Sequence, residues 1–234
     1  MGSSDKLILY TNHRCPWAHR AHIALSELSL PFEEVIIDLD TPRTPEYLAV
    51  NPRGLVPSLS FNGEIIIESA IVSDFLANQY PSHLLPARDS AEYAIKRARI
   101  DLFVDAWFSK FQAQLFKLFA ARTEEEQGAV VEAAVGILVK EVEPKLGNAK
   151  PFFDGSEKLT QAEVLTGSFA LRLVSLTKAG VYPTQLWDEV EKQAPNVAKW
   201  AKAVAAHPSV NGIYNEQAVI EGTKKRIAKI RGEA

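Results

Sequence analysis

The chain contains a single cysteine, Cys15, in a position that favours a reactive thiol. An apolar run, residues 7–10, and a polar turn precede it, and a helical pattern begins at Pro16. Proline suits the first position of a helix because its missing N–H needs no partner there, so Cys15 is predicted to be the N-cap. Free backbone N–H groups and the helix dipole stabilise a thiolate, as do Arg14 and Arg20 wherever their side chains point toward it. The alternative is an inert cysteine buried as a small apolar residue.

The residues after Cys15 limit its chemistry. In Cys15-Pro16-Trp17-Ala18 the fourth position holds alanine, where a dithiol oxidoreductase has its second cysteine. Cys15 could attack a disulfide or another electrophilic sulfur, but the chain has no second thiol to release the adduct. The second thiol must therefore come from solution, and glutathione is the abundant cytosolic candidate.

Two further dipeptides could bind a peptide-like ligand. Val56-Pro57 opens a predicted strand, and a cis bond there would turn the backbone groups of Val56 outward as an edge-strand docking site. An ordinary trans proline in a loop is the alternative. Glu68-Ser69 lies between a strand and a helix, so Ser69 is predicted to be an N-cap. Free N–H groups and the serine hydroxyl there either bind a carboxylate or simply cap the helix.

Composition and charge exclude several classes of protein. The net charge of −3 and the pI near 6.0 argue against a general affinity for nucleic acids or anionic membranes. No apolar run approaches the roughly 18 residues that span a bilayer, and residues 1–5 show no secretory signal. A single cysteine permits no internal disulfide, so we expect a cytoplasmic protein. His13, His19 and His22 have no carboxylate between them, so we expect a solvated helix surface there and no metal site.

The first eighty residues alternate between strand-like and helix-like segments. Strands are expected at 7–10, 32–38, 57–61 and 64–67, and helices at 16–28, 46–50 and 69–79. Asn62-Gly63 suits the type I′ turn of a hairpin. The helix at 69–79 is expected to bury Ile71, Val72, Phe75 and Leu76. The order βαβ followed by ββα predicts a small mixed sheet with helices packed on it.

The character of the chain changes near residue 81. Residues 81–86 carry two prolines and have the composition of a linker. Beyond them only helices are expected, at 90–121, 124–146, 161–179, 184–205 and 208–229. Thr160 and Glu163 form a capping box at the start of the third of these helices. We therefore expect an α/β domain, residues 1–83, and an all-helical domain, residues 84–234.

These motifs, in this order, resemble those of the cytosolic glutathione transferases, specifically the omega class and its fungal and bacterial relatives. The matching segments are Cys15-Pro16-Trp17-Ala18, residues 51–59, Glu68-Ser69, residues 81–86 and residues 160–163. The resemblance implies a thioredoxin-like N-terminal domain, an all-α C-terminal domain, glutathione as co-substrate and a homodimer.

The resemblance also implies a role for each matching residue. Cys15 occupies the catalytic position, where other classes have tyrosine or serine. Val56, before a cis Pro57, would pair through its backbone with the cysteinyl part of glutathione. Glu68 and Ser69 would bind the ammonium and the carboxylate of the γ-glutamyl end.

Two positions depart from the pattern of the omega-like enzymes. Arg53 stands where they usually have lysine, which binds the glycine carboxylate, and arginine keeps that charge. Glu163 stands where their capping box usually has aspartate, and glutamate fits the box equally well.

A second substrate would lie beside Cys15, against the helical domain. The candidate residues lining its pocket are Trp17, Trp107, Phe111, Phe169 and Arg172. The alternative is that the aromatic residues belong to the core, as they usually do at helical spacing.

Three functions are compatible with these residues. The first is a glutathione-dependent thiol transferase or reductase, in which Cys15 forms a mixed disulfide with glutathione that a second glutathione resolves. Its substrates would be mixed disulfides, dehydroascorbate or glutathionyl ketones. The second is a transferase that adds glutathione to, or removes it from, a specific metabolite in secondary or xenobiotic metabolism. The third is a non-catalytic regulatory relative, against which the complete set of glutathione residues argues.

Overall fold

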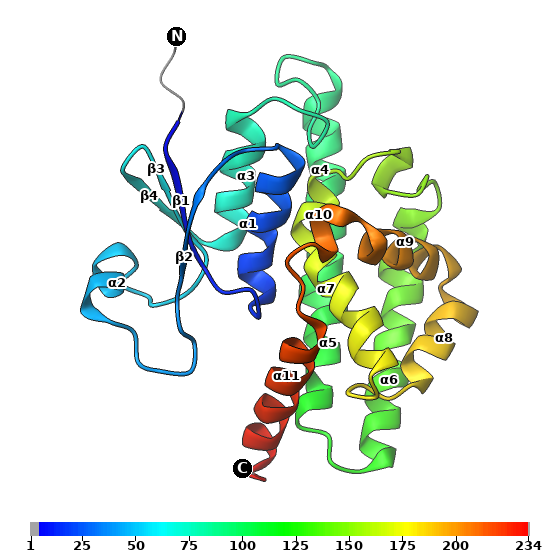
Figure 1. The fold of residues 1–234 in the computed structure, drawn as a ribbon. Helices are drawn as coiled ribbons and strands as arrows, with labels where there is room; N and C mark the ends of the chain where they lie inside the picture. The colour runs from blue at the N-terminus through cyan, green and yellow to red at the C-terminus, as the bar shows by residue number, and fades with distance from the viewer. Residues whose placement is uncertain (1–4, 234) are drawn as a thin grey trace.

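A four-stranded mixed sheet forms the centre of the N-terminal domain in this computed structural model, which describes residues 5–233 (Figure 1). Residues 1–4, which contribute to the prediction about a secretory signal, lie outside the described residues, as does residue 234. The strands are β1 (Leu7–Thr11), β2 (Glu33–Ile36), β3 (Ser58–Phe61) and β4 (Glu64–Ile67), in the order β2-β1-β3-β4. β1 runs parallel to β2 and antiparallel to β3, which pairs antiparallel with β4. Asn62 and Gly63 both have positive φ, 52° and 94°, as a type I′ turn requires.

Helices cover both faces of this sheet. α1 (Pro16–Glu27) and α3 (Ser69–Gln79) pack against one face, and the short α2 (Pro45–Val50) lies on the other (Figure 1). The prediction that α3 buries Ile71 is wrong, because the buried stripe of α3 follows Val72 and Leu76, and Ile71 is 57% exposed.

The rest of the chain is helical. A long first helix consists of α4 (Glu92–Asp105), a π-helical segment (Ala106–Gln112), α5 (Ala113–Leu115) and a 3₁₀ turn (Phe116–Phe119). α6 (Glu124–Ile137) likewise continues into a π-helical segment (Leu138–Val142) and a 3₁₀ turn (Glu143–Leu146), and a further 3₁₀ turn covers Phe153–Gly155. α7 (Gln161–Lys178), α8 (Gln185–Gln193), α9 (Pro195–Ala206), α10 (Pro208–Asn211) and α11 (Glu216–Arg231) follow. None of the described helices combines the length and apolarity that crossing a membrane requires.

Two of the predicted helices are interrupted. The helix predicted at 184–205 divides at Ala194, whose φ of −132° and ψ of 63° are not helical, because the residue before a proline avoids the helical region. The helix predicted at 208–229 divides between Asn211 and Glu216, and the side chain of Asn215 caps the new start by accepting from the N–H of Ala218 at 3.0 Å.

α7 joins the two domains. It is buried along nearly its whole length, and it contacts α1 of the N-terminal domain as well as α9. Gly167 permits this close packing, since a Cβ there would meet Cγ1 of Val204 at 3.1 Å and Cδ1 of Ile23 at 3.6 Å. The thioredoxin-like domain followed by an all-α domain is confirmed, and α1 brings Cys15 to the junction between them.

Candidate functional site

Cys15 is the N-cap residue of α1, as predicted, and it is half-buried. Its Sγ lies 3.9 Å from the carbonyl oxygen of Val56, and the Val56-Pro57 peptide bond is cis. Its backbone carbonyl accepts from the N–H of His19 at 3.1 Å, which begins the helix. Cys15 packs against the small apolar cluster of Ala18, Tyr47 and Val56 and is also one of the residues that line a cavity, so it is not enclosed in the core.

The residues expected to bind glutathione lie around the start of α3. Nη1 of Arg53 and Oε1 of Glu68 form an ion pair at 2.5 Å, with side chains that are 63% and 43% exposed. Ser69 is the first residue of α3 and not its N-cap as predicted, because the helical dihedrals begin only after Glu68, which has a φ of 73°. The Ser69 hydroxyl accepts from Nη1 of Arg20 at 3.0 Å.

Arg20 does not extend toward solvent but links the two domains. Its Nε donates to the carbonyl of Leu165 in α7 at 2.7 Å, and its guanidinium carbon lies 4.6 Å from the ring centre of Trp17. Burial lowers the pKa of Arg20 to about 9, while negative charge on Asp74 and Cys15 acts in the opposite direction. Arg20 is therefore a cation near the thiol that also holds the Ser69 hydroxyl in place.

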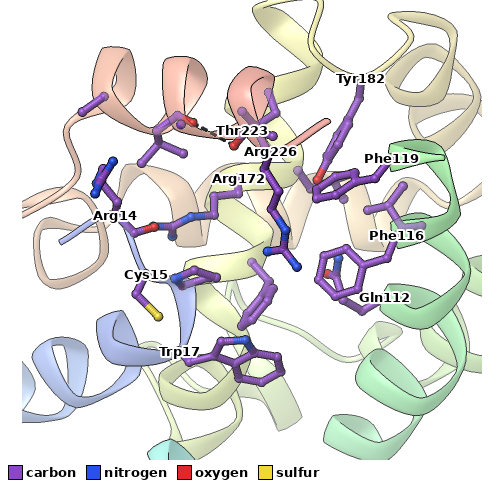
Figure 2. Close-up of a pocket in the computed structure, with 18 of the residues that line it drawn as sticks. Arg14, Cys15, Trp17, Gln112, Phe116, Phe119, Arg172, Tyr182, Thr223 and Arg226 are labelled. Atoms are coloured by element: carbon purple, nitrogen blue, oxygen red, sulfur yellow. Dashed lines mark hydrogen bonds between the residues drawn. The ribbon is translucent and has the colours of Figure 1, made fainter. Parts of the chain in front are cut away.

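A cavity of about 350 Å³ opens beside Cys15 between the domains (Figure 2). Its apolar wall includes Trp17, Leu39, Phe116, Phe119, Phe169 and Leu173. Arg172 lines it too, so three of the predicted pocket residues, Trp17, Phe169 and Arg172, lie where they were expected.

Trp107 and Phe111 do not reach this cavity, so their predicted role is wrong. Both are fully buried, and the Trp107 ring packs against Phe111 at 5.1 Å and Trp200 at 5.3 Å between ring centres. They face the interior of the helical domain, and Gln112 and Phe116 on the same long helix face the cavity instead.

Most other residues of the cavity were not found from the sequence, and Tyr182 and Arg226 are two of them. Arg226 belongs to a basic run near the C-terminus, which is typical of a solvated helix face. Figure 2 shows it reaching from α11 toward the space between Trp17 and Phe116. Tyr182 follows α7 in a turn, and no spacing in the sequence connects it with Cys15.

The prediction of a solvated histidine surface on α1 is wrong. His19 is fully buried and His22 is 4% exposed, because α1 is enclosed between the sheet and α7. β2 supplies a carboxylate to this group: Oε1 of Glu34 lies 2.7 Å from Nε2 of His13 and 3.4 Å from Nε2 of His22. These three groups have the types of metal ligands, but Nε2 of His22 also lies 2.9 Å from Oγ1 of Thr11. Hydrogen bonds therefore already engage the nitrogen that a metal ion would need.

Several known proteins are similar to this chain in sequence or in fold. Residues 14–79 match the family described as Glutathione S-transferase, N-terminal domain. The chain is 26% identical to pyrimidodiazepine synthase of Drosophila melanogaster over 91% of its own length and 82% of that protein. It is 28% identical to glutathione S-transferase omega-1 of Rattus norvegicus, over 72% of its own length and 67% of the relative. Its structure superimposes on that of rice GST1 in complex with glutathione with a TM-score of 0.81 and 25% identity, covering 97% of this chain and 99% of the other. In sequence, residues 14–79 are thus similar to the N-terminal domain of the glutathione transferases, and the longer chain is similar to an omega-class member of that family.

Proposed function

We propose that the protein is a glutathione-dependent thiol transferase in which Cys15 is the nucleophile. The observation that carries the proposal is the position of the only cysteine: it is an N-cap residue, 3.9 Å from the Val56 carbonyl and open to an apolar cavity. A hydroxyl nucleophile would need a neighbouring base, whereas a thiol at a helix N-terminus is activated by the free N–H groups and the dipole.

The residues around the start of α3 fit the charges of glutathione. Glutathione carries an ammonium and a carboxylate at its γ-glutamyl end and a second carboxylate at its glycine end. Glu68 and Ser69 would bind the γ-glutamyl end, and Arg53 the glycine carboxylate. Arg53 and Glu68 are exposed and neutralise each other, so each can exchange its partner for a group of the ligand. The rice relative binds glutathione on the same fold, which supports this placement.

The proposed reaction is a pair of thiol–disulfide exchanges. The Cys15 thiolate attacks the glutathionyl sulfur of a mixed disulfide; the S–S bond of the substrate breaks, and the other sulfur leaves as a thiolate that takes a proton from solvent. The Cys15–glutathione disulfide is then attacked by the thiolate of a second glutathione. Glutathione disulfide leaves, the Cys15 thiolate is regenerated, and the protein undergoes no net oxidation or reduction.

Two further properties belong to this proposal. The protein would act as a homodimer in the cytoplasm, where reduced glutathione is abundant. Sedimentation velocity on the purified protein tests the first property, and fractionation of the source cells tests the second.

The decisive experiment follows the mass of the intact protein after incubation with glutathione disulfide. The wild type should gain one glutathionyl group that reduced glutathione removes, and Cys15→Ser should gain none. If the wild type binds glutathione but gains no mass, thiol exchange is wrong, and conjugation of glutathione to an electrophile becomes the better function for this site.

A further inference from the structure

The cavity beside Cys15 has an unbalanced charge. Three arginines line it, Arg14, Arg172 and Arg226, against one carboxylate, that of Asp40. Asp40 is already engaged, because its Oδ2 lies 2.7 Å from Nη2 of Arg14. Within residues 5–233, neither Arg172 nor Arg226 has a carboxylate at salt-bridge distance.

Arg172 is a buried cation with neutral partners. It is 7% exposed, and it donates to the carbonyls of Ser168 at 2.9 Å and Arg14 at 3.2 Å. Its Nη1 also lies 3.2 Å from Nδ1 of His19, whose pKa burial holds well below the ordinary value, so that ring is neutral. Burial lowers the pKa of Arg172 to about 10, which expresses the cost of a charge kept from water without a carboxylate partner, while negative charge on Tyr214 and Cys15 acts in the opposite direction. An anion that enters the cavity would reduce that cost.

Arg226 and Tyr182 are two further polar groups that line the same cavity. Arg226 is exposed and reaches inward from α11, with its guanidinium carbon 5.4 Å from the ring centre of Phe119 (Figure 2). Tyr182 is buried, which raises the pKa of its hydroxyl, while Arg172 and then Arg226 act to lower it. The Tyr182 hydroxyl therefore stays protonated and can donate a hydrogen bond in the cavity that both arginines line.

The remaining walls suit the body of an aromatic ligand. Phe116, Phe119 and Phe169 offer ring faces and edges, and Leu173 and Leu176 complete the apolar surface. A cavity of about 350 Å³ is of the size that encloses a small organic molecule. Guanidinium groups bind planar carboxylates with paired hydrogen bonds, so a single carboxylate matches these donors better than a spherical anion does.

We propose that the cavity selects aromatic carboxylates as second substrates, with the carboxylate held between Arg172 and Arg226 and the ring against Phe116, Phe119 and Phe169. The identification of this ligand as a substrate rests on the proposed function, but its binding does not require the thiol. The substrate class would be mixed disulfides or electrophiles whose aromatic group carries a carboxylate.

The test compares two unreactive probes of equal shape, 2-naphthoate and 2-naphthamide, by isothermal titration calorimetry. The wild type should bind the carboxylate at least about tenfold more tightly than the amide, because a paired guanidinium–carboxylate contact exceeds a neutral one by about that factor. Arg226→Met should reduce this preference to about threefold or less, and Arg226→Lys should keep part of it. Lys225→Met is the matched control, since it removes an adjacent exposed charge of α11 that does not line the cavity.

Two results would overturn the inference: equal binding of both probes by the wild type, or a preference that Arg226→Met leaves unchanged. Arg226 lies at the exposed mouth, so its replacement should leave the fold intact. The same titration with Cys15→Ser separates this inference from the proposed function. Cys15→Ser should keep the preference, because this binding does not require the thiol. A wild-type protein that keeps the preference but gains no glutathionyl group would contradict thiol exchange alone, and efficient glutathionylation of the wild type without any preference would contradict the carboxylate site alone.

Discussion

Replacement of Glu163 by glutamine should lower the stability of the protein by about 2 kcal/mol. A carboxylate can accept hydrogen bonds from all of its buried donors here, and an amide can accept from only some of them. The Glu163 carboxylate is fully buried and accepts from four donors. Oε1 accepts from the backbone N–H of Phe153 and from Nε1 of Trp200, both at 2.8 Å. Oε2 accepts from the backbone N–H of Thr160 at 2.8 Å and from its hydroxyl at 2.7 Å.

Glutamine can satisfy only part of this set. With its amide oxygen toward Phe153 and Trp200, its NH₂ group faces Thr160, whose hydroxyl can turn to accept but whose backbone N–H cannot. A buried donor without a partner costs about 1–3 kcal/mol, and the remaining bonds lose the strengthening that a charged acceptor provides. Burial raises the pKa of Glu163, and relief of that desolvation in the neutral amide offsets part of the loss. The net expectation is about 2 kcal/mol.

Unfolding in guanidinium chloride, followed by tryptophan fluorescence, measures this difference. Glu163→Gln should lower the midpoint with little change in the slope. Replacement of Glu157, an exposed glutamate in the loop before α7, by glutamine should change stability by less than about 0.5 kcal/mol. A glutamine variant as stable as the wild type would refute the argument that the carboxylate is needed for these four donors.

Two further predictions concern acid stability and glutathione binding. Burial lowers the pKa of His22 from 6.5 to about 4. Between pH 6.5 and pH 4 the unfolded chain therefore binds a proton at this residue and the native protein does not. The native state consequently loses stability as the pH falls through this range. The wild type should therefore lose about 3 kcal/mol more than His22→Gln between pH 6.5 and 4 in denaturant titrations, and parallel curves would show that His22 is not the cause. Arg53→Met should weaken glutathione binding about tenfold in calorimetry, and Arg53→Lys should restore most of it because a cation suffices for the glycine carboxylate. Unchanged affinity in Arg53→Met would remove Arg53 from the site.

Local signals in the sequence predicted the parts of the structure that depend on neighbours along the chain. Cys15 before a proline, the Asn62-Gly63 turn and the capping box of Glu163 each follow from a few adjacent residues, and each is present. Pro195 could have been recognised as a break, but the apolar pattern continues across it and favoured one longer helix.

Tertiary packing determines which of the candidate residues line the cavity, and the sequence alone did not predict this. Trp107, Phe111 and Phe169 have the same apolar character, yet only Phe169 lines the cavity. Which face of a helix meets the neighbouring domain depends on the helix's rotation and crossing, and these are set by contacts such as that of α1 with α7 at Gly167. The approach of Arg226 to the cavity depends likewise on the path of α11, which residues far apart in the chain determine.

The π-helical segment Ala106–Gln112 has a consequence for how this cavity can evolve. A π-helical turn holds about one residue more than an α-helical turn, so deletion of one residue there would let the helix rewind as α. Because the wider turn holds the extra residue locally, the residues after it would keep nearly their present direction, and Phe116 and Phe119 would stay in the cavity wall. The length of this helix can therefore change by one residue within the segment without loss of the cavity. A relative whose helix lacks that residue would align with this chain at the cavity wall only if the gap is placed inside the segment.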